Sequence, residues 1–356
     1  MEATIATTPA AVAVACVLLT SFYLIYRRRA RRAAAPQQPP PIETVDLPNG
    51  KSIYHLRSAE TDLLYGEIFK GNCYRLPESD PDVEKYSLQL SPDAVVVDVG
   101  ANIGMFALWA AWHEQTAGRV RVLSFECVPS TYAVLKMNAE LYTNHFTLLE
   151  AHGYGLGSEE KSAIVHHHPN FSIWSTSDAA MDSQRDAMLH ENIPHLAHRV
   201  SARDDLPGMV QQLPSWLVRF VVKFAGRRIL SSLNATEAVE CRFRRLSDAV
   251  FRDGKVETIT LLKVDVEGAE MEVLNGIDAA DWRRIEQVAM ECENERLAAE
   301  ATALLEGHGF SVRTWISDDM KALLPTSEVR QLIAKRFGNT AKAKGTPLEV
   351  ATPADT

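Results

Sequence analysis

AVVVDVGANIG, residues 94–104, is the stretch of sequence that decides the fold. Residues 94–99 form a short continuous apolar run, which is typical of a strand buried on both faces of a parallel sheet. Gly100 and Gly104 bound a turn, and residues 105–112 (MFALWAAW) then have the composition of a buried helix. A strand, a glycine turn and a helix in this order predict a doubly wound α/β fold whose turn approaches a nucleotide-like ligand.

An acid just ahead of this turn, Asp98, indicates which cofactor the turn binds. A dinucleotide turn follows a GxGxxG pattern, which this turn lacks, and a carboxylate there would repel the pyrophosphate. S-adenosylmethionine has no phosphate and carries an ammonium and a sulfonium, so an acid beside it is favourable. We therefore predict that the turn binds S-adenosylmethionine; the alternative is that Asp98 only orders the turn through local hydrogen bonds. The predicted contacts are Asp98, Gly100, Ala101, Asn102 and Gly104.

The next two predicted strands supply further cofactor contacts. Residues 120–126 (VRVLSFE) end in Glu126, about twenty residues beyond the turn, where Rossmann-type folds place the acid that accepts the ribose hydroxyls. Residues 146–158 (FTLLEAHGYGLGS) form a third strand and a glycine-containing turn, which places His152 and Gly153 near the adenine. The alternative for Glu126 is an acid that occurs at this position by chance.

A second motif, LLKVDVEGAEMEVLNGI at residues 261–277, predicts another buried strand that runs into a helix. Asp265 and Glu267 follow this strand, and Glu291 lies toward the end of the next one, IEQVAMECE. Because the carboxyl ends of parallel strands meet at one edge of a sheet, these acids should project into the ligand crevice. Asp265 or Glu267 is the predicted general base or acceptor-orienting group, and Glu291 is a second candidate.

The motifs DVGANIG (residues 98–104) and VDVEGAE (residues 264–270), in this order, resemble the FkbM family of methyltransferases over residues 94–312. The resemblance implies a Rossmann-like class I methyltransferase with a mostly parallel sheet and S-adenosyl-L-methionine as methyl donor. It also implies O-methylation of a small-molecule, sugar or lipid-like acceptor. One departure is Cys127 after Glu126, where the family usually has proline. Two alternatives stay open: a membrane-anchored S-adenosylmethionine-binding protein without catalysis, and a nicotinamide-dependent oxidoreductase.

The N-terminus predicts a membrane anchor. Residues 3–26 carry no charge, and residues 10–26 would span roughly 25 Å as a helix. Five arginines follow within residues 27–32, so the positive-inside rule predicts a single-pass protein whose catalytic part faces the cytosol. The alternative is an organelle-targeting presequence. Residues 33–41 form a proline-rich linker.

The remaining chain divides into three predicted parts. Residues 42–90 are a pre-domain segment with helical spacing over 59–69, which either caps the active site or completes the core. Residues 91–330 are the methyltransferase domain, with an insertion at 204–233 that is a lid, a membrane contact or an ordinary helical pair. Residues 331–356 are predicted to be a disordered tail.

Charge and cysteine usage exclude two classes of function. The 356-residue chain has a formal net charge of −9, which argues against a nucleic-acid partner. Its five cysteines are scattered and form no CxxC pair, as expected for free thiols rather than a zinc site. Three histidines at 166–168 would alternate between the two faces of a strand, so we predict no metal site.

Overall fold

The computed structural model describes residues 41–201, 217, 220, 223 and 235–337, apart from positions 72, 255, 318–320, 322 and 323. Its first elements are β1 (Glu43–Asp46), β2 (Ser52–His55), α2 (Ser58–Tyr65), the π-helical turn η1 (Gly66–Lys70), α3 (Val83–Tyr86), β3 (Ala94–Val99), α4 (Met105–Trp112), η2 (Glu114–Thr116), β4 (Val120–Phe125), α5 (Pro129–Tyr142), β5 (Thr147–His152), β6 (Gly155–Gly157) and β7 (Lys161–His167). They continue as η3 (Ser172–Trp174), α6 (Ala179–Ser201), β8 (Glu237–Arg245), η4 (Ser247–Arg252), β9 (Leu261–Val264), α9 (Glu270–Asn275), η5 (Trp282–Arg284), β10 (Gln287–Cys292), α10 (Glu295–Gly307), β11 (Ser311–Trp315) and β12 (Arg330–Lys335).

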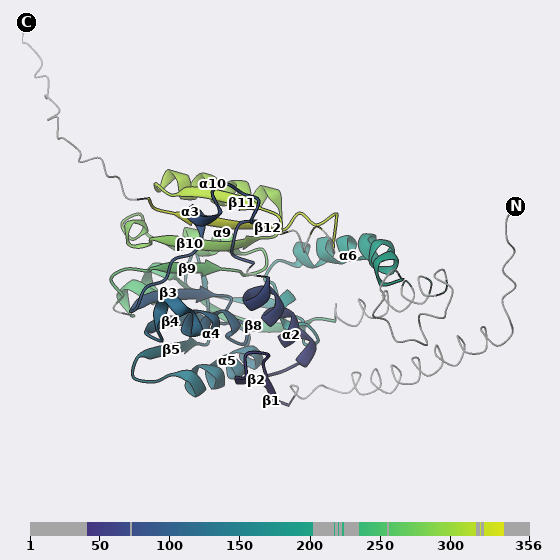
Figure 1. Cartoon of the computed structure of the whole chain (residues 1–356), viewed down its shortest axis with the longest axis horizontal. Coiled ribbons are helices and arrows are strands. Elements are labelled where there is room, and N and C mark those ends of the chain that lie inside the picture. The colour runs from purple at the N-terminus through teal and green to yellow at the C-terminus, as the bar shows by residue number, and fades with distance from the viewer. Residues whose placement is uncertain are drawn as a thin grey trace, which may run out of the picture.

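The centre of the fold is a seven-stranded sheet in the order β11-β12-β10-β9-β3-β4-β5 (Figure 1). β10, β9, β3, β4 and β5 run parallel, whereas β12 is antiparallel to both of its neighbours. Chain order reverses at β3, which leads to β4 on one side and lies beside β9 on the other, so this is the switch point where such sheets bind ligands. The predicted Rossmann-like, mostly parallel α/β fold is confirmed.

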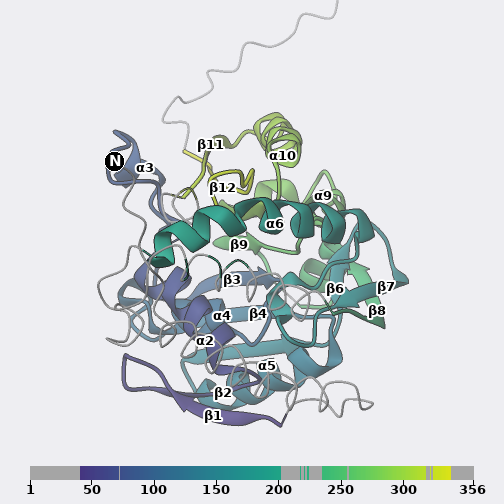
Figure 2. The ribbon, with the colours of Figure 1, turned by 90° about the vertical axis from the view of Figure 1, so that its right-hand side faces the viewer.

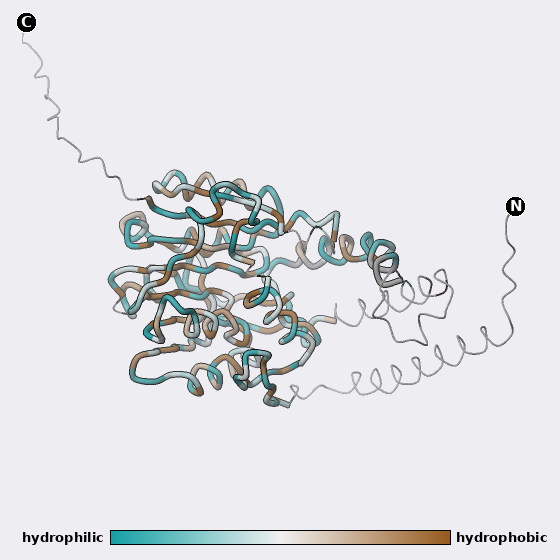
Figure 3. The backbone as a smooth tube through the Cα atoms, viewed as in Figure 1, coloured by the Kyte–Doolittle hydropathy of each residue, from teal (hydrophilic) through white to brown (hydrophobic). Residues whose placement is uncertain are grey.

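Both faces of the sheet are buried because its strands are apolar at successive positions. Val96 of β3 packs with α4 and α5, whereas Val97 and Val99 on the opposite face pack with η4, α9 and α10. In Figure 3 the hydrophobic colouring follows the strands through the centre of the molecule. Alternate side chains of a strand point to opposite faces, so a continuous valine run requires helices on both sides.

The pre-domain segment packs against the main domain. The hairpin β1-β2 is tied to α5, where the Asn138 side chain accepts the Tyr54 backbone N–H at 2.8 Å and donates to the Ile103 carbonyl at 2.8 Å. The predicted helical segment 59–69 is helical in the structure, as α2 and η1. A smaller sheet, β6-β8-β7, is built from the chain after β5 and the chain before β9.

Figure 2 looks toward the side of the molecule that carries α6, which crosses above α2 in this view. Within the part of the chain that the structure describes, no helix has the length and apolar character needed to cross a bilayer. The predicted anchor and its flank (1–32), and nearly all of the linker (33–41) and of the insertion (204–233), lie outside the described residues.

One predicted boundary is wrong. The domain does not end at residue 330, because β12 runs through Lys335 between β10 and β11. Leu332, Ile333 and Ala334 have no exposed surface. The apolar run at residues 332–334 is short and flanked by polar and charged residues, so it gives a weak local signal, yet it forms an inner strand that joins β11 to the rest of the sheet.

Candidate active site

A cavity of about 750 Å³ opens at the carboxyl ends of the central strands. Its walls include the turn after β3, the ends of β4, β9 and β10, and residues of α2, η1 and η3. A volume of this order is typical of small-molecule sites, which span roughly 300–1,000 Å³. The position is the one expected for a ligand in an open, doubly wound sheet.

The glycine turn lines this cavity through Gly100, Ala101 and Asn102. Gly100 has φ +74°, and a Cβ there would lie 1.8 Å from the Asp265 carbonyl oxygen, so only glycine allows the two strand ends to approach. Asn102 also has a positive φ, +49°, and its backbone N–H donates to Glu126 Oε2 at 3.0 Å. These three residues lie where the sequence predicted them.

Two residues predicted to contact the cofactor, Asp98 and Gly104, instead support the turn from outside the cavity. Asp98 is fully buried and does not line the cavity; Lys263 Nζ lies 3.2 Å from its Oδ1 and donates to the Gly100 carbonyl at 2.9 Å. Asp98 therefore acts on the turn through a lysine of the neighbouring strand β9, whereas the alternative interpretation named local hydrogen bonds. Gly104 (φ +91°) permits close packing, since a Cβ there would lie 2.9 Å from the Leu135 side chain.

Glu126 lies at the end of β4 and faces the cavity. Its carboxylate accepts the backbone N–H groups of Val128 at 2.8 Å and Asn102 at 3.0 Å. Burial raises the pKa of Glu126 to about 7, although these two hydrogen bonds favour its charged form. The acid predicted for the ribose is therefore at the cavity wall and joins the turns after β3 and β4.

His152 and Gly153 do not line the cavity, contrary to prediction. The His152 ring stacks on Phe125 with centroids 4.7 Å apart, and Gly153 packs against the Tyr132 ring. This packing keeps the end of β5 behind the cavity wall. Gly155 and Leu156 of β6, a few residues later, line the cavity instead.

The three predicted catalytic acids all line the same cavity. Asp265 is 3.4 Å from the Lys263 ammonium and accepts the Tyr74 hydroxyl at 3.3 Å. A neighbouring ammonium and a phenol donor both stabilise a carboxylate charge, so Asp265 is held in place by groups on β9 and on the pre-domain segment.

Glu267 and Glu291 are in a different electrostatic state. Burial and then the nearby Glu293 charge raise the pKa of Glu267 well above its ordinary value, although Arg185 lies 3.7 Å from its Oε2. Burial and then the Asp265 charge raise the pKa of Glu291 in the same direction. The amide of Gln331 donates to Glu291. Both shifts favour the protonated form of these groups, in which a carboxylic acid cannot accept a proton.

The sequence did not single out four residues that face this cavity: Glu67, Tyr74, Lys263 and Gln331. Lys263 carried a signal, because a charged residue inside the apolar run LLKV must find a buried partner. Glu67 and Tyr74 lie in the pre-domain segment, and Gln331 lies in β12, so their place in the cavity depends on long-range packing.

Among the described residues, no three histidine, cysteine, aspartate or glutamate side chains converge closely enough to hold a metal ion. Of the histidine triplet, the backbone of His166 bridges to Thr176, and His167 Nδ1 lies 3.0 Å from the Ser175 hydroxyl.

The sheet order and the cavity at its switch point define the class, a Rossmann-like α/β protein with a site for a nucleotide-like ligand. Residues 98–312 match the Methyltransferase FkbM domain. The chain is 32% identical over 298 residues to 31-O-demethyl-FK506 methyltransferase FkbM of Streptomyces tacrolimicus, covering 83% of this chain and 97% of that protein. The protein belongs to the FkbM family of methyltransferases.

The chain is also similar to other proteins. Methyltransferase 1 of Beauveria bassiana is 29% identical over 302 residues, which cover 83% of this chain and 98% of that protein. Among solved structures, methyltransferase FkbM from Methylobacillus flagellatus KT has 14% identity and a TM-score of 0.40, with 76% of this chain and 52% of that chain covered.

The family implies S-adenosylmethionine as the methyl donor, and the cavity residues fit such a molecule. The lining includes the acids Asp62, Glu67, Glu126, Asp265, Glu267 and Glu291, whereas Lys70 and Lys263 are the cations among its described residues. The Lys263 ammonium is already taken by Asp98 and Asp265. An acidic cavity favours a ligand with an ammonium and a sulfonium and disfavours a pyrophosphate.

Proposed function

We propose that this methyltransferase methylates a hydroxyl oxygen of a small-molecule, sugar or lipid-like acceptor, with a carboxylate after β9 assisting. The observation that carries the proposal is the position of Asp265, which faces the same cavity as Glu126 and the glycine turn. The groups proposed for the donor and for the acceptor thus line one cavity, as an in-line transfer requires.

On the donor side, Glu126 and the turn residues Gly100, Ala101 and Asn102 would hold S-adenosylmethionine. The cofactor supplies an electrophilic methyl group when bound. Asn102 and Val128 donate their backbone N–H groups to Glu126, and these contacts fix the rotamer of its carboxylate. The acid is therefore oriented before any ribose hydroxyl reaches it.

On the acceptor side, Asp265 is the best placed of the three predicted acids. Its side chain is 29% exposed, which leaves an oxygen open to the hydrogen bond of an acceptor hydroxyl. Lys263 and Tyr74 hold the carboxylate in one orientation. Phe106 and Trp174 also line the cavity, and their apolar surface would exclude water and strengthen the polar contacts.

The test is to incubate the full chain with isotopically labelled S-adenosylmethionine and a metabolite or membrane extract, and to detect labelled products by mass spectrometry. Calorimetric titration with S-adenosylmethionine and with NAD accompanies it. We expect donor binding and a methylated hydroxyl compound. Binding without any labelled product would favour a non-catalytic binding protein, and binding of NAD alone would favour an oxidoreductase.

We also propose that residues 10–26 anchor the protein in a membrane with the catalytic domain on the cytosolic side. The support is the uncharged stretch followed by arginines in the sequence. Deleting residues 1–32 should move the protein to the soluble fraction and leave donor affinity unchanged. Continued membrane association of the truncated protein would contradict the anchor, and import into an organelle with cleavage would identify a presequence instead.

A further inference from the structure

Glu67 reaches the cavity from the pre-domain segment because of the way η1 is fixed. Tyr65 and Phe69 stack with ring centroids 4.8 Å apart, and the ring centroids of Phe69 and Trp112 of α4 lie 5.8 Å apart. Residues four apart share one side of a helical turn, so Glu67, halfway between them, points to the other side. Its side chain lines the cavity. π-helical turns of this kind are frequent at functional sites.

The cavity carboxylates at the ends of the sheet strands already have hydrogen-bond or ion-pair partners. These partners are two backbone N–H groups for Glu126, Lys263 and Tyr74 for Asp265, Arg185 for Glu267, and Gln331 for Glu291. For Glu67, no donor among the described residues forms a hydrogen bond or ion pair with the carboxylate. Both of its oxygens are therefore available to a ligand.

The surroundings of Glu67 also suit proton transfer. Solvent reaches the exposed side chain through the cavity, and Asp265, Glu291 and the Cys73 thiol lie close enough to interact with it electrostatically. Partial desolvation within the cavity, and then the Asp265 charge, raise the pKa of Glu67 to about 7. A base is most effective when its pKa lies near the working pH.

We propose that Glu67 is the general base of the methyl transfer and that Asp265 orients the acceptor. This inference rests on the proposed function and names the destination of the proton. As the acceptor oxygen gains the methyl group, its O–H bond breaks and the proton passes to the Glu67 carboxylate, while the electron pair of the sulfur–methyl bond stays on sulfur. Glu67 then returns the proton to solvent through the cavity opening.

The assignment gives the pre-domain segment a chemical role in addition to its packing role. Tyr74 of the same segment holds Asp265, so residues 66–74 supply both the base and a group that positions the orienting acid. The α2–η1 segment is thereby part of the active site, which favours the capping alternative for residues 42–90.

The test compares Glu67→Gln, Glu67→Asp and the control Glu43→Gln in the full chain. Glu43 is an exposed carboxylate on β1, in the same pre-domain segment, and it does not line the cavity. The assay is labelled transfer to the extract product that the wild type methylates. Glu67→Gln should lower turnover about 10²- to 10⁴-fold with donor affinity unchanged, and Glu43→Gln should leave turnover unchanged.

Two further measurements separate a base from a structural residue. The wild-type rate should rise with pH through about 7, since protonated Glu67 cannot accept a proton. Glu67→Asp should keep this rise in rate with pH, at a lower overall rate, whereas Glu67→Gln should lose the rise. In carbon NMR of glutamate-labelled protein, the carboxyl resonance that Glu67→Gln removes should titrate near pH 7 without any acceptor present.

Three outcomes would overturn the assignment. Near wild-type turnover of Glu67→Gln, an unchanged rise in rate with pH in that variant, or a Glu67 resonance that titrates at the ordinary value near 4.5 would each do so. If the wild type binds the donor but yields no methylated product, the proposed function itself fails and the base assignment falls with it.

Discussion

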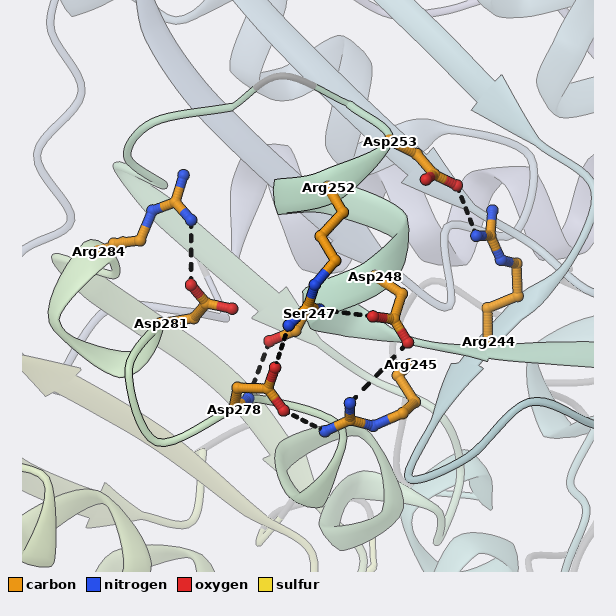
Figure 4. A network of polar contacts seen from close by, with 9 residues as sticks. All are labelled: Arg244, Arg245, Ser247, Asp248, Arg252, Asp253, Asp278, Asp281 and Arg284. Atoms are coloured by element: carbon orange, nitrogen blue, oxygen red, sulfur yellow. Dashed lines mark hydrogen bonds and ion pairs between the residues drawn. The ribbon is translucent and has the colours of Figure 1, made fainter.

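Two groups of carboxylates in this protein have opposite surroundings. On the surface around β8 and η4, each acid of a network is matched to an arginine (Figure 4). Its pairs are Arg244–Asp253, Arg245–Asp248, Arg245–Asp278, Arg252–Asp248, Arg252–Asp278 and Arg284–Asp281. In the cavity, acids outnumber cations and the two lysines are at its rim or already paired.

The carboxyl groups of these two regions therefore have pKa shifts in opposite directions. Hydrogen bonds from Arg252 and Arg245 lower the pKa of Asp278, whereas burial raises the pKa of Glu67, Glu126, Glu267 and Glu291. Paired surface acids are common and contribute little to stability. Buried acids without matching cations destabilise a fold and persist mainly where chemistry needs them. The comparison marks the cavity as the functional region.

The largest effect on turnover is expected from substituting Asp265. Asp265→Asn keeps the shape of the side chain but loses the negative charge that pairs with Lys263 and orients the acceptor. Turnover should therefore fall about 10²- to 10⁴-fold, with donor affinity changing far less. Glu267→Gln should change turnover far less than Asp265→Asn, because an amide mimics the protonated form that the raised pKa of Glu267 favours.

Labelled-product assays with both variants measure this contrast. Equal losses in the two variants would mean that Glu267 works as an ionised base and that its burial does not keep it protonated. Loss of donor binding or of folding in Asp265→Asn would mean that this acid holds the turn, and not the acceptor.

The next largest effect concerns the donor. Glu126→Ala should weaken S-adenosylmethionine binding about 10- to 150-fold, the loss that one hydrogen bond to a charged group implies. The variant also frees the N–H groups of Asn102 and Val128, so Glu126→Gln, which can still accept one of them, should bind more tightly than Glu126→Ala. Calorimetry tests both, and unchanged affinity in Glu126→Ala would remove the ribose assignment.

A third effect is the pH dependence of stability. The folded pKa of Glu126 is about 7 against an ordinary 4.5, so the native state binds the extra proton between these values. Stability from the protonated group is complete below pH 4.5 and is lost as pH rises through 7. Glu126→Gln should match the wild type at low pH and exceed its unfolding free energy by about 3 kcal/mol above pH 7.

Urea unfolding of both proteins from pH 4.5 to 8 provides the measurement, because the difference between the curves cancels the other titrating groups. A constant difference across this window would contradict the raised pKa. The wild type alone is less informative, since His167, whose pKa burial lowers to about 4, contributes a dependence of the opposite sign.

Local patterns predicted much of this site. The apolar run 94–99 and the helix pattern 105–112 coincide with β3 and α4, and the acids after β4, β9 and β10 line one cavity. Strand ends in a parallel sheet converge, so an acid that follows a strand is visible in a one-dimensional pattern. The direction of a single side chain is less visible, and Asp98 turned out to face Lys263 on the neighbouring strand.

The rest depends on contacts between distant parts of the chain. Glu67 reaches the cavity because Phe69 packs on Trp112, and Gln331 reaches it because β12 inserts beside β10. Neither contact leaves a periodic signal in the local sequence. His152 was misplaced for a related reason, since its stacking on Phe125 decides which residues of the third strand form the wall.

The smallest expected effect belongs to the surface network. Asp253→Asn removes the partner of Arg244, and both side chains are partly exposed, at 54% and 29%. An exposed ion pair gains little over its hydrated parts and is screened by salt, so the unfolding free energy should fall by about 1 kcal/mol or less, and by less still in high salt. Methyl transfer and donor affinity should not change, because neither residue lines the cavity. Urea unfolding at low and high ionic strength, beside the labelled-product assay, tests both parts.

A loss of activity without a loss of stability would mean that the network is coupled to the cavity, for example through β8, whose Phe243 forms part of the cavity wall. The separation between surface acids matched to arginines and cavity acids in excess of cations would then no longer hold for this protein.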